Sequence, residues 1–412
     1  MSNRWTCAGL VLSLSPFAVL AWAQQAAPDT AKSAPDPIAI LVGQLSLDRY
    51  KATIKGLTQF GDRRQGTDRN RAATDWIEAQ LKSYGCPTER LHYTFDAPAA
   101  GAGGRGGQGR GPADPSAAPG GARRRGYRIV DQVNTDPMKQ PDVRIRELDA
   151  QPMTPGPREE VYCTKTGTTH PDEMYIVSAH MDGHGWNEAA DDDGSGTALV
   201  MELARIFSSP DVSTERSIRF ILWNNEETGS GGARAYVEQR KDLQGVESPP
   251  GSGRYPEPKW LGMIQHDMLM FDHGMPLPNG TIPAKQRPEA DINLEYQVNA
   301  KLAEPAMLLA QKFLLANDKY SSDYPATLGL HMTNTDSGPF MDFTPSITVR
   351  EAERGAQLGQ GWNPHHHQPT DLYSTYDDND FRLGLNSAQM TLGAVAQLTG
   401  AKLTGVKPAS SR

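Results

Sequence analysis

The chain has 412 residues, of which 37% are hydrophobic, and its formal net charge is −8. This length allows one large α/β domain or two ordinary ones, and the apolar content is enough for a sizeable core. The mildly acidic balance argues against a nucleic-acid partner, because phosphate binding needs a basic face. The basic run at residues 123–125 lies among glycines and is interpreted as a solvated loop rather than a functional patch.

The first 23 residues are typical of a secretory signal peptide. Arg4 precedes an apolar stretch at residues 8–22, and Ala21-Trp22-Ala23 fits the small-x-small cleavage pattern. The apolar run is short for a transmembrane span, so an uncleaved anchor is the alternative to a cleaved signal. The sequence therefore predicts a secreted or periplasmic protein with no membrane attachment after cleavage. Residues 24–37 are rich in Ala, Pro and Gln and predict a flexible linker.

A single folded domain is predicted over residues 38–405. Within it, residues 97–126 consist mainly of Gly, Ala, Pro and Arg, a composition that cannot bury enough apolar surface to offset chain entropy. We interpret this segment as a disordered insertion and not as a domain boundary. After signal cleavage two cysteines remain, Cys86 and Cys163. They could form one disulfide in an oxidising compartment or stay as two buried thiols, because the sequence does not give their distance.

Hydrophobic periodicity predicts the helices and strands. A helix begins at Thr67-Asp68 and continues through Leu81. From residue 174 the chain alternates in the order strand 174–179, helix 197–207, strand 218–223, helix 232–240, strand 260–265, helix 303–316, strand 346–349 and helix 385–398. This order predicts an α/β fold with a mostly parallel, mixed central sheet and helices on both faces. Active sites of open α/β sheets lie at the carboxyl ends of the strands.

Histidine and acidic side chains follow the predicted strands where the strands end. They occur in five groups: His180-Met181-Asp182, Asp191-Asp192-Asp193, Glu226-Glu227, His266-Asp267, and His365-His366-His367 with Asp371. Each group alone has a structural interpretation as a helix cap, a solvated loop charge or a hydrogen-bonded histidine. Together, such charges would repel one another at one sheet edge unless cations neutralised them. A mixed set of histidines and carboxylates suits zinc, and a bridging carboxylate suits a pair of metal ions.

These motifs resemble, in kind and in order, the M28 family of zinc aminopeptidases. The resemblance covers roughly residues 45–400, and it includes the Asp-Asp-Asp-Gly-Ser-Gly turn, the Glu-Glu-Thr-Gly step and the His-x-Pro-x-Asp pattern that starts at His367. It implies a zinc-exopeptidase-like fold and a secreted enzyme with two zinc ions per chain. Such an enzyme would hydrolyse peptide bonds and release N-terminal residues from a peptide substrate.

The same resemblance implies a role for each site residue. His180 and Asp267 would bind one zinc ion, Glu227 and His367 would bind the other, and Asp192 would bridge both. Glu226 would be the general base. Adjacent glutamates suit this division, because neighbouring side chains in extended backbone point in opposite directions, so one can ligate while the other faces the water. Asp182 would lie behind His180 and fix its tautomer.

Two positions depart from a simple match. The triple histidine leaves the register open, and His367 is chosen because Pro369 and Asp371 follow it at the family spacing. His365 and His366 are then pocket or surface residues. The family often has a histidine where Ser337 stands, so a substrate contact at Ser337 is in doubt.

Three rival functions remain on this fold. A carboxypeptidase would need a basic partner for the substrate carboxylate, and the candidates are Arg350, interpreted as an ion-pair partner of Glu351, and Arg354. A glutaminyl cyclase would use one zinc ion, and a non-catalytic binding domain would be expected to have lost ligands. The full set of five ligands together with Glu226 favours a hydrolase. The sequence does not indicate side-chain preference or oligomeric state.

Overall fold

The computed structural model describes residues 36–95, 133–272, 292–321, 323–329, 335–351 and 363–404. The predicted signal peptide at 1–23, the linker up to residue 35 and the insertion at 97–126 lie outside these ranges. Pro37, the last residue of the predicted linker, begins helix α1, and the Asp36 side chain caps that helix. None of the helices in the described ranges has both the length and the apolarity that crossing a membrane requires.

The described residues contain an eight-stranded mixed sheet in the order β1-β2-β5-β3-β6-β9-β7-β8. Its strands are β1 Thr88–Phe95, β2 Gly156–Lys165, β3 His170–His180, β5 Arg216–Trp223, β6 Lys259–His266, β7 Ile292–Glu295, β8 Ala326–Gly329 and β9 Ser346–Glu351. The four central strands β5, β3, β6 and β9 are parallel, whereas β1, β2 and β7 join them through antiparallel pairs. Two short strands, β4 Val212–Ser213 and β10 Lys402–Leu403, pair separately. The predicted α/β fold with a mostly parallel, mixed sheet is confirmed, and its parallel centre brings the carboxyl ends of β3, β5 and β6 to one edge.

The helices begin where short polar side chains satisfy their first backbone N–H groups. Thr67 caps the helix predicted from that residue, Asp193 caps the helix after β3, and Asp377 forms a capping box. The helices are α1 Pro37–Val42, α2 Leu47–Leu57, α3 Asp68–Ser83, α4 Val143–Asp149, α5 Gly194–Phe207, α6 Gly231–Arg240, α7 Ala303–Tyr320 and α9 Asp378–Thr399. Short 3-10 turns are η1 Thr58–Phe60, η2 Pro137–Lys139, η3 Glu226–Thr228, η4 Gly338–Phe340 and η5 Tyr373–Thr375.

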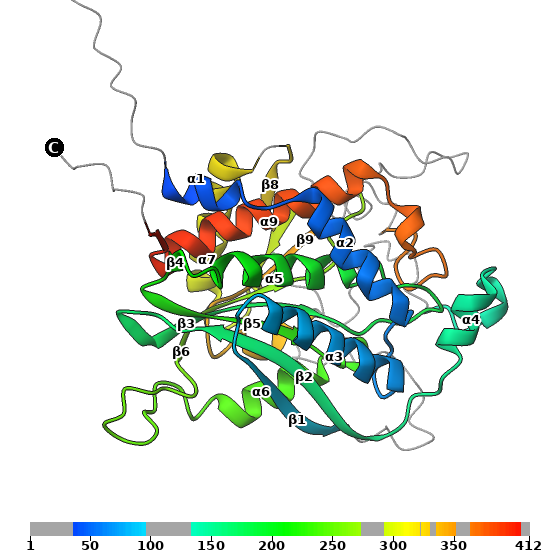
Figure 1. The fold of residues 1–412 in the computed structure, drawn as a ribbon, viewed down its shortest axis with the longest axis horizontal. Helices are drawn as coiled ribbons and strands as arrows, with labels where there is room; N and C mark the ends of the chain where they lie inside the picture. Colours follow the sequence, from blue (N-terminus) through cyan, green and yellow to red (C-terminus); the bar gives the residue numbers. More distant parts are fainter. Residues whose placement is uncertain are drawn as a thin grey trace, which may run out of the picture. The chain divides into compact units, whose positions relative to one another are not determined.

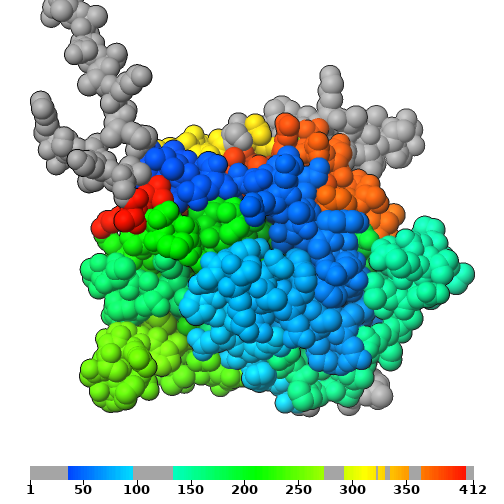
Figure 2. Space-filling model, in the orientation of Figure 1, coloured from blue at the N-terminus to red at the C-terminus, as the bar shows by residue number. Residues whose placement is uncertain are grey.

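Both faces of the sheet are covered, because alternate side chains of the central strands enter different cores. On β3, Val177 and Ala179 belong to the larger core under α2, α3, α5, α7 and α9. Ile176 belongs to the second core, in which Trp223 and Tyr236 pack under α6 and η4. Figure 1 shows α5 and α9 on one side of the strands and α6 on the other, and in Figure 2 the blue N-terminal helices form much of the visible surface. The predicted helices on both faces are therefore confirmed.

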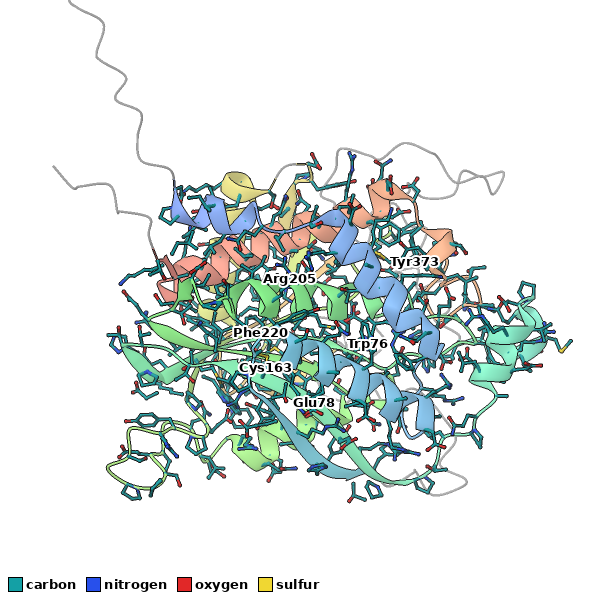
Figure 3. The ribbon with its side chains drawn as sticks, viewed as in Figure 1. Trp76, Glu78, Cys163, Arg205, Phe220 and Tyr373 are labelled. Atoms are coloured by element: carbon teal, nitrogen blue, oxygen red, sulfur yellow. A yellow bond between two sulfur atoms is a disulfide. The ribbon has the colours of Figure 1, made fainter. Side chains whose placement is uncertain are left out.

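A disulfide joins Cys86, which follows α3, to Cys163 on β2, with a Cα–Cα distance of 5.7 Å. Cys163 lies opposite Thr88 in the β1–β2 ladder, and it is seen beside α3 in Figure 3. The sequence left open whether these cysteines form a disulfide or stay as two thiols, and the structure contains the disulfide. The bond ties α3 to the antiparallel edge of the sheet.

Candidate metal centre

The side chain of one buried arginine binds the backbone of the loop between β3 and α5. Arg63 donates hydrogen bonds to the carbonyl oxygens of Met181, Glu188 and Ala189 at 2.7, 2.8 and 2.7 Å. The five N–H groups of a guanidinium lie in one plane, so carbonyls bound to it are held in a fixed arrangement. The segment that contains the predicted ligands His180 and Asp192 therefore has a fixed backbone.

The first group of candidate ligands lies at the ends of β3 and β6. His180 Nε2 lies 3.3 Å from Asp192 Oδ1 and 3.8 Å from Asp267 Oδ1, and all three side chains are buried. The opposite ring atom, Nδ1, contacts the backbone carbonyl of Asp182 at 2.9 Å. That carbonyl can only accept, so Nδ1 carries a proton and Nε2 is the ring atom that faces the group, where it could bind a metal once it is deprotonated.

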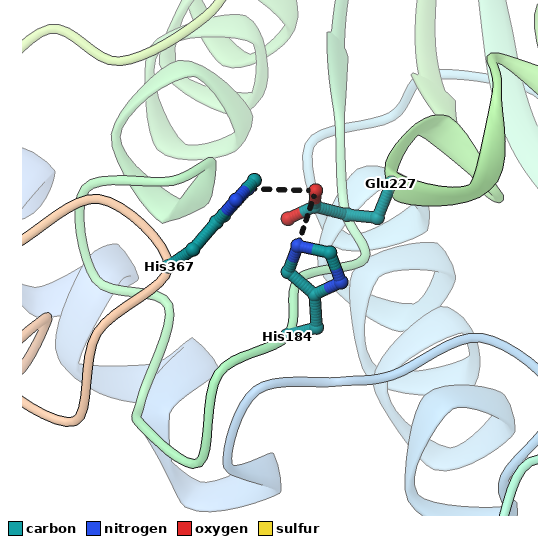
Figure 4. A group of neighbouring side chains, drawn as sticks. All are labelled: His184, Glu227 and His367. Carbon is teal, nitrogen blue, oxygen red and sulfur yellow. Dashed lines mark ion pairs between the residues drawn. The ribbon is translucent and has the colours of Figure 1, made fainter. Parts of the chain in front are cut away.

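The second group contains Glu227, His367 and a histidine that the sequence interpretation missed, His184. Glu227 Oε2 lies 2.9 Å from His367 Nε2 and 3.0 Å from His184 Nε2, and dashed lines mark these two ion pairs in Figure 4. Asp192 Oδ2 lies 3.0 Å from His367 Nε2, so Asp192 belongs to both groups. The five ligands predicted from the sequence thus lie together, arranged around Asp192.

The three aspartates before α5 have different partners. Asp193 accepts a hydrogen bond from the backbone N–H of His180 at 3.1 Å, and Asp191 accepts from two backbone N–H groups that follow β6. Asp371 accepts from the N–H groups of Asp191 and Asp192 at 2.9 and 3.2 Å. Within the triplet, Asp191 and Asp193 therefore hold neighbouring backbone, whereas the Asp192 carboxylate faces the histidines.

Glu226 and Glu227 begin the 3-10 turn η3 directly after β5. The expectation of extended backbone at this pair was wrong, but successive side chains in a 3-10 turn also point in different directions. The carboxylate of Asp182 accepts a hydrogen bond from the backbone N–H of Glu226 at 3.0 Å, while its Oδ1 lies 3.9 Å from His180 Nδ1. Asp182 thus contacts His180 through its main chain and Glu226 through its side chain, whereas we expected its carboxylate to orient His180.

The acidic groups of the site separate into two electrostatic classes. Burial raises the pKa of Glu226 well above its ordinary value, and repulsion from Asp336 and other carboxylates adds to the effect that His180 opposes. Burial likewise raises the pKa of Asp336 strongly, and that of Asp182 to about 6. These carboxyls are costly to ionise as long as no positive charge lies nearby.

Asp192, Asp267 and Glu227 behave in the opposite way. Burial would raise the pKa of Asp192, but the histidines around it lower the pKa well below its ordinary value. Burial is also outweighed at Asp267, where the Arg350 guanidinium lowers the pKa, and at Glu227, where His184 and His367 lower the pKa to about 2. The three carboxylates predicted to be ligands are therefore ionised, which is the form that binds a metal.

The side chains present fit divalent zinc. Two groups, His180 with Asp192 and Asp267, and His184 with Glu227 and His367, each bring three donor atoms within 4.8 Å of one another. Imidazole nitrogens and carboxylate oxygens are zinc donors. Glu227 Oε1 and Asp192 Oδ2 are buried, and among the described residues neither has a partner with hydrogen-bond geometry, although Asp192 Oδ2 lies 3.0 Å from His367 Nε2. A cation would satisfy both oxygens and reduce the repulsion among the surrounding carboxylates.

Several other residues from the sequence analysis have structural partners. His266 turns away from the site and contacts the Ser178 carbonyl and the Thr391 hydroxyl, at 3.0 and 2.9 Å. Ser337 is buried and shares a hydrogen bond of 2.7 Å with Thr348. Through these contacts both residues bind groups other than the five predicted ligands.

Of the two arginines considered as partners for a substrate carboxylate, Arg350 has a different ion-pair partner from the one expected. Arg350 forms a buried ion pair with Asp267, whereas Glu351 points to the opposite face of β9 and accepts a hydrogen bond from the backbone N–H of Phe271. The expected pairing of Arg350 with Glu351 was therefore wrong. Arg354 lies outside the described residues.

Within the triple histidine, His366 is closer to the site than expected. Its Nε2 lies 3.2 Å from Asp192 Oδ2, and its ring stacks on that of His367 at 3.7 Å. His365 is held by Thr370, with Nδ1 at 2.8 Å from the hydroxyl. The alternate spacing of His180, Asp182 and His184 was the signal that could have identified His184 from the sequence.

The profile described as Peptidase family M28 matches residues 160–383, which is more than half of the chain. Carboxypeptidase Q of Xenopus laevis is 28% identical over 124 residues, which cover 30% of this chain and 24% of that protein. Aminopeptidase YwaD of Bacillus subtilis is 42% identical over 75 residues, which cover 18% of this chain and 16% of that protein. A Mycobacterium tuberculosis protein described as "probable lipoprotein aminopeptidase LpqL" is 28% identical over 59% of this chain and 46% of its own length. These matches span less than half of each relative.

Solved structures share the fold at low sequence identity. The aminopeptidase from Aneurinibacillus sp. strain AM-1 has a TM-score of 0.55 at 18% identity, covering 91% of this chain and 98% of that one. BSAP, a zinc aminopeptidase from Bacillus subtilis, has a TM-score of 0.56 at 15% identity, covering 88% and 97%. Porphyromonas gingivalis glutaminyl cyclase has a TM-score of 0.52 at 16% identity, covering 86% and 98%. With the profile match over its central sheet and metal centre, the chain belongs to peptidase family M28.

Proposed function

We propose that this protein is an exported two-zinc exopeptidase that releases residues from the N-termini of peptides. His180, Asp192 and Asp267 would hold one zinc ion, and Asp192, Glu227 and His367 would hold the other. The observation that carries the proposal is the position of Asp192. One of its oxygens lies 3.3 Å from His180 Nε2 and the other lies 3.0 Å from His367 Nε2, so a single carboxylate joins the two groups.

When bound, the zinc ions would polarise the scissile carbonyl of the substrate and increase the acidity of the attacking water. Glu226 would accept the proton of that water and deliver it to the leaving amine. Asp182 would position both partners, because its carbonyl contacts His180 and its carboxylate accepts the backbone N–H of Glu226. The different directions of Glu226 and Glu227 in η3 would separate the base from the ligand.

The charge of the site favours a substrate amine over a substrate carboxylate. Glu226, Asp182 and Asp336 are acidic groups close enough to shift one another's pKa, and a protonated amine would be stabilised among them. A carboxypeptidase would need a cation for the substrate carboxylate, and Arg350 is already engaged in its ion pair with Asp267. Aminopeptidases and carboxypeptidase Q both occur among the relatives, so this charge argument supports the choice between them.

Export is supported by the disulfide between Cys86 and Cys163, because disulfides persist in oxidising compartments. The predicted signal peptide and the name of the lipoprotein relative point in the same direction. A peptide would be the partner at the site, with no role for nucleic acid. We place the mature protein in the periplasm or outside the cell.

Metal analysis combined with peptide digestion tests the proposal. The purified protein should hold close to two zinc ions per chain, and strong chelation should abolish an activity that zinc restores. Mass spectrometry of an unblocked peptide should show a ladder shortening from the N-terminus, N-acetylation should stop it, and C-terminal amidation should not. A ladder from the C-terminus would reject the aminopeptidase in favour of a carboxypeptidase. One zinc ion and cyclisation of N-terminal glutamine would support a cyclase, and stable binding of peptides without cleavage would support a binding domain.

A further inference from the structure

We propose that His184 is a fourth protein ligand at the metal position formed by Glu227, His367 and Asp192. The inference rests on the metal binding that the proposed function requires, and it adds a residue outside the five ligands assigned above. It makes the two metal positions unequal, because the position formed by His180, Asp192 and Asp267 has three protein donors.

The geometry brings two imidazoles to one carboxylate oxygen. His184 Nε2 and His367 Nε2 lie 3.0 and 2.9 Å from Glu227 Oε2, and the two rings meet edge to face at a centroid distance of 4.1 Å. Figure 4 shows the rings approaching Glu227 from two loops. The donor atoms of the three side chains lie within 4.8 Å of one another, so one ion could bind to all three.

Hydrogen bonding alone does not account for this cluster. Nε2 of His184 is buried and, among the described residues, has no partner with hydrogen-bond geometry, although it lies 3.0 Å from a carboxylate oxygen. Glu227 Oε1, on a side chain that is 5% exposed, has no hydrogen-bond partner among them either. Buried polar atoms without partners are costly, and a shared cation would satisfy both.

The two histidine-bearing loops are fastened together by side-chain amides. Asn187 Nδ2 donates to the carbonyl of His184 at 3.0 Å and to that of Gln368 at 2.9 Å. Asn134 donates its backbone N–H to the His367 carbonyl at 3.0 Å and its Nδ2 to the Gly185 carbonyl at 3.3 Å. The close approach of His184 to His367 is therefore built into both loops.

Gly185 and His367 have backbone conformations that this approach requires. Gly185 has φ of +116°, and a Cβ at that position would lie 2.6 Å from the His367 carbonyl oxygen, so the contact needs glycine. His367 itself has φ of +56°, which is uncommon for a residue other than glycine. Such conformations persist where the surrounding structure enforces them, and they cluster at functional sites.

A difference in metal affinity follows from the donor sets. A zinc position with four protein donors is closed, whereas a catalytic position keeps one place open for water or substrate. With His184, Glu227, His367 and Asp192 as donors, this position would be closed, and the three-donor position would stay open to water and substrate. At the other position, Asp267 shares its charge with Arg350, which leaves less of it for a cation. We therefore expect one tight and one weaker zinc-binding step.

Competition between the protein and a zinc chelator of known affinity measures both steps. The wild-type protein should take up two zinc ions in unequal steps, and His184→Ala should weaken the tighter step by more than about tenfold, the loss that even an outer partner of a ligand causes. His365→Ala is the matched control, because its side chain bonds to Thr370, and both steps should remain. Two unchanged steps in His184→Ala would overturn the proposal.

A His184→Cys variant tests the contact directly, without relying on the loss of a residue. If position 184 faces the metal, cobalt added in place of zinc should produce a thiolate-to-cobalt charge-transfer band that the wild-type protein lacks. Circular dichroism establishes that the variant is folded. Two bound cobalt ions without that band would reject His184 as a ligand and leave the proposed peptidase intact. If the wild-type protein binds metal but cleaves no peptide, the band would still appear, and the proposed function alone would fail.

Discussion

Arg350 and Asp267 form a buried ion pair that connects the ends of the adjacent parallel strands β9 and β6. Their side chains are 5% and 4% exposed, and Asp267 is at the same time a predicted zinc ligand. Burial would raise the pKa of Asp267, but the guanidinium outweighs it and keeps the carboxylate ionised. Arg350 thus places a positive charge beside Asp267, and a metal ion bound to Asp267 would place a second positive charge there.

From this relationship we predict that Arg350→Met destabilises the metal-free protein far more than the zinc-loaded protein. Removing one partner of a buried pair leaves an uncompensated charge, a cost of about 3–5 kcal/mol. Zinc bound to Asp267 would offset part of that cost. Urea denaturation of both forms measures the two differences in unfolding free energy.

Arg71→Met is the control for this variant, because Arg71 pairs with Asp68 at an exposed position. It should change stability little, and equally in both forms, because an exposed ion pair is screened by solvent. An equal loss of stability in the metal-free and zinc-loaded forms of Arg350→Met would contradict the interpretation of Asp267 as a ligand.

The adjacent glutamates should separate catalysis from metal binding. Glu226→Gln should retain zinc and lose roughly 10²–10⁴-fold in turnover, because the general base is removed. Glu227→Gln should instead lose zinc affinity, since it exchanges a charged ligand for a neutral amide. Metal analysis and peptide hydrolysis on the same preparations distinguish the two. Near wild-type turnover of Glu226→Gln would show that the roles are assigned wrongly.

The parallel centre of the fold could be predicted because β3, β5 and β6 each contain a short, mostly apolar run that is buried, such as residues 218–223 of β5. The polar residues directly after those runs then fall at one edge by topology alone. Strands β1 and β2 were not predicted. In β1 only Leu91 is fully buried, and β2 buries the charged side chains of Arg158 and Glu160, so neither shows a clear apolar pattern.

Details that depend on which atom makes a contact could not be predicted from residue spacing. Asp182 was expected beside His180, but the sequence does not show that its carbonyl makes that contact while its carboxylate accepts from Glu226. Arg350 and Asp267 are separated by 83 residues, and their pairing depends on the order of strands in the sheet. The spacing from His180 and Asp182 marks His184 as a candidate, but its contact with Glu227 also depends on the approach of the loop that carries His367.

The stability of the α3–β1 contact should depend on pH through Glu78. This carboxylate is 16% exposed and accepts hydrogen bonds from Arg90 and Thr88. Burial raises its pKa, but these bonds and Lys82 outweigh burial and lower the pKa to about 2 from its ordinary value of 4.5. A lowered pKa means that the contribution is complete above pH 4.5 and is lost as the pH falls towards 2.

Denaturation of wild-type protein and Glu78→Gln between pH 7 and pH 3 checks this dependence. The wild-type advantage should be about 1 kcal/mol at neutral pH after solvent screening, and it should shrink below pH 4.5. Glu238→Gln, at an exposed pair with Lys241, should change stability less. An advantage that grows on acidification would have the wrong sign for this ion pair.

The disulfide should stabilise the folded protein mainly by restricting the conformations of the unfolded chain. It closes a loop across 77 residues, so replacing both Cys86 and Cys163 by alanine should lower the unfolding free energy by about 2–4 kcal/mol. Thermal unfolding with and without a reducing agent provides the comparison. The reductant should destabilise the wild-type protein and leave the double variant unchanged, and equal melting of oxidised and reduced wild-type protein would exclude a structural disulfide.

The register of the triple histidine is the remaining assignment, and alanine substitutions at the three positions decide it. His367 Nε2 lies within 3.0 Å of both Asp192 and Glu227, so His367→Ala should lose zinc and activity together. His365→Ala should retain both, since its ring is held by Thr370. His366 Nε2 lies 3.2 Å from Asp192 Oδ2, and Asp192 also contacts His180 and His367, so we expect His366→Ala to keep two zinc ions while activity changes only moderately. Zinc content measured on the three variants separates these outcomes. Loss of zinc from His366→Ala with retention in His367→Ala would move the ligand by one residue and would require the second metal position to be reassigned.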